Sequence, residues 1–338
     1  MKLSYILLPA LALLCAACSP IVRVHESGHR PAMTEYTDEG YVPVTIENID
    51  EKGAPRSEVY EHPPERVVAV WQNSIETLLA LGVGERIVVG MGVPDARYIR
   101  PEYRAAYEAI PYTSLENLDV ETILMMQPDL IVGWASTFSP KVLRGTSFWA
   151  GRGVHTYIAP SSARATKSKT IAQECEDIRN LGRIFGREER ANALVGEMEH
   201  EIAFVAEKTA GMEPRPRALV IELMGKEIRS YGADTLAGDM MRALGAEHLA
   251  ADGQSLSMEE IITLDPDAIF LIVIEDDYGN EDAIRARITE NPALRSLSCV
   301  RDNRVYTVPL YAVYSAGIRT YDGITIFAHG LYPEIYGE

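Results

Sequence analysis

The chain has 338 residues, of which 47% are hydrophobic, so one or two domains with packed cores are expected. Asp and Glu number 49 against 32 Lys and Arg, which gives a formal net charge of -17 at pH 7. Because this charge repels phosphates, it argues against nucleic acid and anionic lipid headgroups as partners. The acidity keeps a protein soluble and does not by itself select a ligand.

The first residues are typical of an export signal. Lys2 precedes an apolar run, residues 6–14, which is far shorter than the roughly 20 residues that a bilayer requires. We therefore expect a signal segment over residues 1–18 rather than a membrane span.

The signal ends like the processing site of a bacterial lipoprotein. Ala16 and Ala17 stand directly before Cys18, although Cys15 occupies the position where that pattern usually has Leu. We expect Cys18 to carry lipid, which would hold the protein in the periplasm or at the cell surface by this anchor alone. Residues 19–41 are polar and without periodicity, so they are predicted to form a flexible tether. Plain secretion after cleavage nearby is the alternative.

Two cysteines remain if Cys15 is removed and Cys18 is lipidated. Export permits a disulfide between Cys175 and Cys299, but they lie far apart in the sequence. We expect two unpaired, buried thiols.

The first half of the chain predicts a hairpin followed by alternating strands and helices. The hairpin is expected from the β-prone runs 42–48 and 56–62, which flank a turn-rich segment. Short apolar runs then alternate with amphipathic helical segments, a pattern typical of a mainly parallel sheet covered on both faces. The predicted strands are 67–71, 87–90, 129–134 and 154–160, and the predicted helices are 74–81 and 118–126.

A segment of different composition separates the two halves of the chain. Residues 165–211 are charged, Ala-rich and helical, with a break or kink expected at Gly182 and Gly186. A helix of about 20 to 25 residues there would be ~30 Å long, the height of a lobe. Strands resume at 218–224, 268–274 and 304–310. The predicted fold is therefore α/β, with two Rossmann-like lobes (42–164 and 212–338) joined by a long connecting helix (165–211).

An internal repeat supports two lobes of similar build. Residues 118–132, LDVETILMMQPDLIV, match residues 256–270, LSMEEIITLDPDAIF, in the spacing of Leu, Glu, Pro-Asp and the apolar strand that follows. A second echo pairs the Ala-Leu-Gly that ends at Gly82 with the one that ends at Gly245. Pro stops each helix and Asp opens the turn into the strand.

These two segments, together with HPPERVVAV at 62–70, resemble the iron-siderophore, haem and vitamin B12 class of periplasmic binding proteins. The similarity extends over residues 43–335. It implies a rigid helical connector, a ligand cleft between the lobes, modest lobe closure, and delivery of the ligand to the permease dimer of an ABC importer. It also implies that Glu121 and Glu259, at matching places in the repeat, meet arginines of the permease. Complementing the N-terminal dipole of a helix is the alternative role for both.

In open α/β sheets, ligands bind beyond the carboxyl ends of the strands. This rule selects ligand-binding candidates from both lobes: Trp71, Gln72, Asn73, Trp134, Glu222, Tyr231, Tyr311 and Arg319. It also selects the neighbouring segments 91–94, 275–278 and 312–318.

The aromatic members suit a large flat or chelated ligand, with core packing as the alternative for each. Arg319 is predicted to pair with an anionic chelate through its guanidinium.

The ligand is expected to bring its own metal. None of the seven His residues stands at a predicted strand end with a second His or Cys nearby, so we expect neither a bare metal-ion site nor a resident cofactor. A ferric siderophore is the first expectation, followed by haem, with Tyr98 or Tyr231 as axial ligand, or cobalamin.

No nucleophile elbow, zinc-protease or redox Cys motif is present, so we do not expect an enzyme. A secreted α/β enzyme using Glu222 or Glu275 is the rival prediction, and a surface scavenger without a permease is a third. We expect a monomer.

Overall fold

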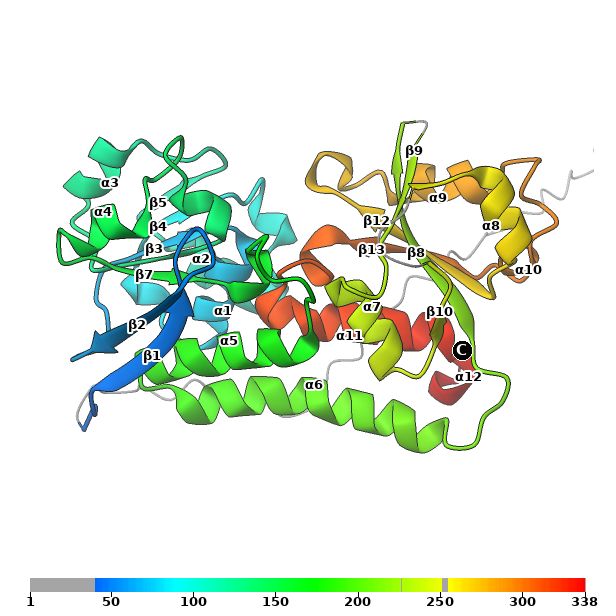
Figure 1. The fold of residues 1–338 in the computed structure, drawn as a ribbon, viewed down its shortest axis with the longest axis horizontal. Coiled ribbons are helices and arrows are strands. Elements are labelled where there is room, and N and C mark those ends of the chain that lie inside the picture. The colour runs from blue at the N-terminus through cyan, green and yellow to red at the C-terminus, as the bar shows by residue number, and fades with distance from the viewer. Residues whose placement is uncertain (1–39, 226, 251–254, 338) are drawn as a thin grey trace, which may run out of the picture.

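The computed structural model describes residues 40–225, 227–250 and 255–337. Figure 1 shows two α/β lobes side by side above a pair of helices, α5 (Ile171–Ile184) and α6 (Glu188–Lys208). The predicted signal segment, Cys18 and nearly all of the predicted tether lie outside the described residues. No helix within the described ranges is both long and apolar enough to cross a membrane.

The N-terminal lobe is built on a five-stranded parallel sheet, in the order β5-β4-β3-β6-β7. Every residue of β3 and β6 is buried, which is why these strands read as continuous apolar runs. The strands are β3 (Val67–Val70), β4 (Ile87–Met91), β5 (Tyr112–Ser114), β6 (Leu130–Gly133) and β7 (His155–Ile158). The helices are α1 (Gln72–Ala80), α2 (Arg104–Glu108), α3 (Val120–Met125) and α4 (Thr146–Ala150).

The predicted hairpin precedes this sheet. β1 (Val44–Ile49) pairs antiparallel with β2 (Pro55–Tyr60). Just before it, the Tyr41 hydroxyl donates a hydrogen bond to the carbonyl of Ile184, 3.1 Å away, so the last residue of the predicted tether is tied to the end of α5.

The connector is a helical hairpin, in which the expected break lies at Gly186 between two helices. A capping box at Thr170 starts α5, and the chain reverses direction over residues 185–187, where Gly186 has a φ of 62°. Gly182 lies inside α5, where an added Cβ would stand 2.5 Å from the Cβ of Ala191 on α6. It therefore permits close packing of the two helices. The 21 residues of α6 give the long helix that was predicted, and it runs beneath both lobes (Figure 1).

The C-terminal lobe has a mixed sheet, in the order β11-β9-β8-β12-β13, with β10 paired to β8. β8 (Arg217–Met224), β12 (Ala268–Val273) and β13 (Val305–Pro309) are parallel, as expected. β9 (Glu227–Ser230) runs antiparallel to β8 because residues 225–226 between them are too few for a crossover. The two short strands are β10 (Glu247–His248) and β11 (Ser255–Leu256).

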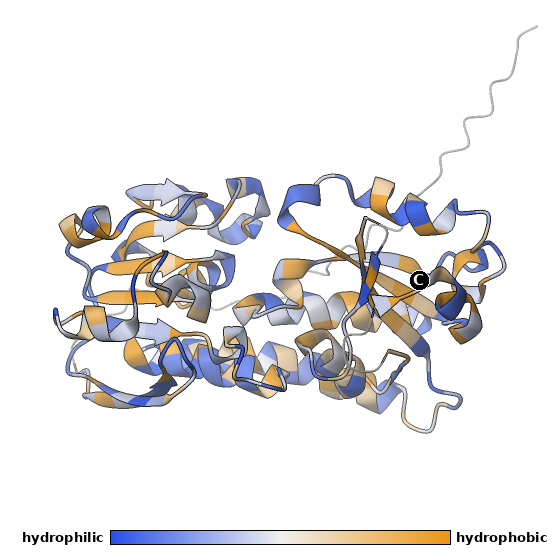
Figure 2. Cartoon of the chain, turned by 45° about the horizontal axis from the view of Figure 1, so that its top comes forward, coloured by the Kyte–Doolittle hydropathy of each residue, from blue (hydrophilic) through white to orange (hydrophobic). Residues whose placement is uncertain are grey.

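The helices of this lobe are α7 (Leu236–Ala243), α8 (Met258–Leu264), α9 (Glu281–Thr289), α10 (Ser298–Arg301), α11 (Thr320–Leu331) and α12 (Pro333–Tyr336). Apolar residues concentrate along the strands of both sheets (Figure 2).

The internal repeat corresponds to one structural device used in both lobes. The carboxylate of Asp129 accepts a hydrogen bond from the backbone N–H of Arg66, and that of Asp267 accepts one from Arg217, at 2.9 and 2.8 Å. Arg66 directly precedes β3 and Arg217 begins β8, the central strands of the two sheets. Their guanidinium groups donate to carbonyls at the C-terminal ends of α3 and α8. The Pro-Asp pair thus joins the end of a helix to two neighbouring strands.

Cys175 and Cys299 are unpaired and buried, which confirms the expectation of two free thiols. Burial raises the pKa of Cys175 to about 11 and that of Cys299 to about 12. Both thiols therefore stay protonated at neutral pH.

Candidate ligand site

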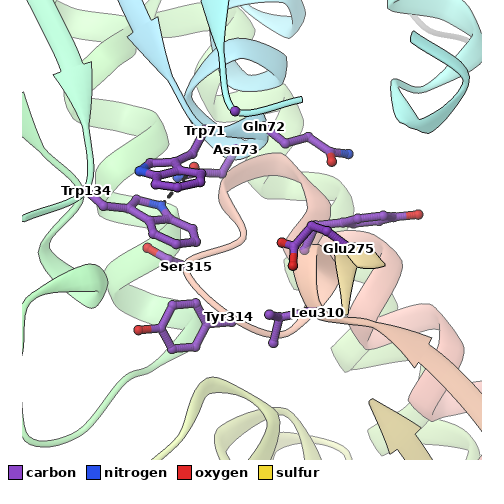
Figure 3. Close-up of a pocket in the computed structure, with 10 residues that line it drawn as sticks. Trp71, Gln72, Asn73, Trp134, Glu275, Leu310, Tyr314 and Ser315 are labelled. Atoms are coloured by element: carbon purple, nitrogen blue, oxygen red, sulfur yellow. Dashed lines mark hydrogen bonds between the residues drawn. The ribbon is translucent and has the colours of Figure 1, made fainter. Parts of the chain in front are cut away.

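A pocket lies between the two lobes, at the carboxyl ends of β3, β4, β6, β12 and β13. Five residues of each lobe line it: Trp71, Gln72, Asn73, Gly92 and Trp134 from the first, and Glu275, Leu310, Tyr311, Tyr314 and Ser315 from the second (Figure 3). The strand-end rule had selected nine of these ten, all except Leu310.

Aromatic rings form one wall of the pocket. The indoles of Trp71 and Trp134 stack with centroids 4.8 Å apart and planes 22° apart, and Tyr314 from the other lobe meets Trp134 edge-on at 5.4 Å. The indole N–H of Trp71 donates to Thr137 Oγ1 at 3.2 Å, and the indole N–H of Trp134 donates to Asn73 Oδ1 at 2.9 Å. These bonds fix the orientation of the rings, so the wall is formed before any ligand arrives.

The backbone of Trp71 is held in an unusual conformation. Its φ of 74° and ψ of 152° fall in a region that is essentially reserved for glycine. The backbone N–H of Trp71 donates to the carbonyl of Met91 at 2.7 Å. The Trp71 ring lies over Gly92, where an added Cβ would be 2.8 Å from a ring carbon. Strain of about 1–3 kcal/mol is typical of such residues, and it is found mainly where a side chain has to be aimed at a ligand.

Arg319, which is predicted to pair with an anionic chelate, has carboxylate partners within the protein. Arg319 is 7% exposed, and its guanidinium donates to both carboxylate oxygens of Glu76, at 2.7 and 2.8 Å. It also donates to Asp322 at 2.7 Å and to the carbonyl of Tyr98 at 2.6 Å. Burial opposes the charged form, but the two carboxylates outweigh it, so the pKa of Arg319 is raised above its usual value. The guanidinium expected to bind an anionic chelate is thus already matched by two acids of the protein.

A second arginine completes a buried cluster of four charges, Glu76, Arg100, Arg319 and Asp322, called here the cross-lobe ion cluster. Arg100 donates to Asp322 through its guanidinium and to Glu76 through its backbone N–H, the latter at 2.8 Å. Burial raises the pKa of Asp322, but the two arginines outweigh it and hold that pKa below its ordinary value.

The ion cluster joins the lobes beneath the pocket. Glu76 lies on α1 of the first lobe, and Arg319 follows β13 in the second. Gln72, which lines the pocket, donates to Glu76 at 2.9 Å, and the ring of Tyr311 lies 4.7 Å from the Arg319 guanidinium carbon. The formally neutral cluster therefore supports the pocket from below without offering it a free charge.

The pattern of the family described as "Periplasmic binding protein" matches residues 67–312. The chain belongs to this family. It is 47% identical to a periplasmic binding protein of Veillonella parvula of known structure, with a TM-score of 0.84 over 87% of this chain and 93% of that one. An uncharacterized ABC transporter substrate-binding lipoprotein of Bacillus subtilis, YvrC, is 24% identical over 307 residues, 88% of each chain. Petrobactin-binding protein YclQ of the same species is 23% identical over 318 residues, 90% of this chain and 93% of that protein.

Three side chains that were predicted to bind the ligand, Glu222, Tyr231 and Tyr98, do not line the pocket of this binding protein. The buried Tyr231 hydroxyl donates to the carboxylate of Glu222 at 2.8 Å. Burial, and then this carboxylate, raise the pKa of Tyr231. Tyr98, the other tyrosine considered as an axial haem ligand, packs against Tyr278 with ring centroids 4.8 Å apart. Sequence proximity to a strand end selected these side chains but did not show which way they point.

The two matched acids of the repeat occupy the same structural position. Glu121 is the second residue of α3 and Glu259 the second of α8, after the N-caps Asp119 and Ser257, and both are exposed. Within residues 40–225, 227–250 and 255–337, no three His, Cys, Asp or Glu side chains come together in a way that could hold a metal ion.

Proposed function

We propose that this protein is an extracytoplasmic binding protein that holds a metal chelate in the pocket between its lobes and passes it to an ABC importer. A ferric siderophore is the first candidate, with haem or cobalamin next. The observation that carries the proposal is the fixed aromatic wall of Trp71 and Trp134 facing Tyr314 across the two lobes. Aromatic faces bury much area against the outside of a chelate at little entropic cost.

The names of related proteins support this proposal. YclQ is named for petrobactin, another relative in Bacillus subtilis for iron uptake, and one in Yersinia pestis for vitamin B12. These ligands differ in chemistry, so the relatives leave the choice among them to the side chains of the pocket.

Tryptophan fluorescence offers a direct test of the pocket. Of the three tryptophans, Trp149 is fully buried in α4 and does not line the pocket. A bound ferric chelate should quench the fluorescence of residues 19–338 and of a Trp149→Phe variant. A double variant, Trp71→Phe with Trp134→Phe, should lose the quenching. If the double variant is quenched as strongly as the Trp149→Phe protein, the ligand binds elsewhere.

We also propose that Glu121 and Glu259 orient the protein on a permease dimer. Each projects from the first turn of a helix on a different lobe, so two charges at a fixed separation would guide docking, an effect that salt should weaken. Replacing both by Ala should leave ligand affinity unchanged and reduce uptake strongly.

A matched control is available for the docking test. Glu108 and Glu290 are exposed acids at the ends of α2 and α9, one on each lobe, and their double Ala variant should transport normally. Equal transport by both double variants would leave Glu121 and Glu259 with only their effect on the helix dipole, about 0.3–1 kcal/mol each.

A further inference from the structure

The charges around the pocket carry information about the charge of its ligand. Among the described residues, ten line the pocket, and none of the ten is Lys, Arg or His. Glu275 is the only Asp or Glu among them. Burial raises the pKa of Tyr311, so this phenol stays neutral at physiological pH.

Three cations close to the residues of the pocket are engaged elsewhere. Arg319 and Arg100 are matched by Glu76 and Asp322 in the cross-lobe ion cluster. The ammonium of Lys169 lies 5.8 Å from the ring centroid of Tyr314, but it donates to the carbonyls of Ser161 and Ala163. A ligand that needed one of these cations would have to break contacts that are already made, and breaking buried ion pairs is costly.

Glu275 adds a negative charge at the rim. It begins the 3₁₀ turn Glu275–Asp277 directly after β12, and all three acids of this turn are exposed. Figure 3 shows its carboxylate above Leu310, across the pocket from Trp134. The negative faces of the stacked indoles and the net charge of -17 act in the same direction.

We propose that this pocket selects a neutral or cationic metal chelate and rejects anionic ones. The inference rests on the proposed binding function and narrows its ligand class. Chelates that saturate the charge of the metal, such as ferric tris-hydroxamates and corrins, fit this rule. Ferric tris-catecholates, which keep several negative charges, do not.

The test uses two matched series of probes in which shape is kept and charge is changed. Ferric desferrioxamine B is singly positive, its N-acetyl derivative is neutral and its N-succinyl derivative is singly negative. Aquocobalamin, cyanocobalamin and a cyanocobalamin monocarboxylate give the same three charges on a corrin. Each is titrated against residues 19–338 by tryptophan quenching and calorimetry. In the series that binds, the positive and neutral members should bind at least about tenfold more tightly than the negative one.

A variant pair assigns the effect to the rim carboxylate. Glu275→Gln should reduce the preference for the positive over the negative member by about tenfold. Asp276→Asn removes a charge from the neighbouring exposed residue, which does not line the pocket, and should change that preference by less than about twofold.

The outcomes separate the inference from the function on which it rests. Tightest binding by the negative member of either series, or submicromolar binding of a ferric tris-catecholate, would overturn the charge rule and leave the binding function intact. Failure of all seven chelates to bind would overturn both.

Discussion

Glu76 is the residue whose replacement most directly tests the cross-lobe ion cluster. Glu76→Gln keeps the shape of the side chain and removes one charge, so Asp322 is left as the one carboxylate of the cluster beside Arg100 and Arg319. Arg319 makes two charge-assisted hydrogen bonds to Glu76, at 2.7 and 2.8 Å, and the Glu76 side chain has no exposed surface. Removing one partner of a buried ion pair costs about 3–5 kcal/mol of unfolding free energy.

The loss should be visible in thermal unfolding. At roughly 2 °C for each kcal/mol in a protein of this size, the midpoint should fall by about 6–10 °C. The measurement is far-UV circular dichroism of residues 19–338, repeated in guanidinium chloride to obtain the free energy. Glu85→Gln is the control, because Glu85 is 69% exposed and lies 3.8 Å from Arg86 in a surface pair. It should lose less than about 1 kcal/mol. If the Glu76→Gln midpoint falls no further than that of the control, the cluster does not stabilise the fold.

Three further predictions follow from single residues. Trp71→Gly should be more stable than Trp71→Ala by about 1–3 kcal/mol in denaturant unfolding, because only glycine adopts φ 74° without strain; the reverse order would mean that the backbone there is unstrained. Burial and then Glu174 raise the pKa of Asp177 from 3.8 to about 8, so the folded protein holds a proton that the unfolded chain releases. Unfolding free energy should therefore fall as pH rises between these two values, and Asp177→Asn should reduce that fall; identical pH profiles would contradict the assignment. Cys18→Ser should release the protein from the membrane fraction, as judged by fractionation and immunoblotting, and retention in membranes would contradict a lipid anchor at Cys18.

Local sequence patterns predicted most of the buried strands and the pocket segments that follow them. The apolar runs of β3, β6, β8 and β12 are readable because both faces of these strands are buried. Once the strands are placed, their carboxyl ends identify the pocket segments. Trp71 and Trp134 were found in this way.

Contacts between distant segments could not be predicted from local patterns. Arg319 and Glu76 are 243 positions apart, and nothing around either residue indicates the other. The chain reversal between α5 and α6 depends on how the two helices pack at Gly182 and Ala191. The antiparallel strand β9 was missed because it has only four residues, Glu227–Ser230, and most of them are polar.

Native mass spectrometry of the protein isolated from its host under metal limitation tests the central claim most directly. We expect a non-covalent complex with one small molecule that carries a transition metal, recognisable from its isotope pattern. This complex should be lost when Trp71 and Trp134 are both replaced by Phe and retained in Trp149→Phe. A bound molecule without metal, or a complex that survives the double replacement, would show that the pocket does not hold a metal chelate.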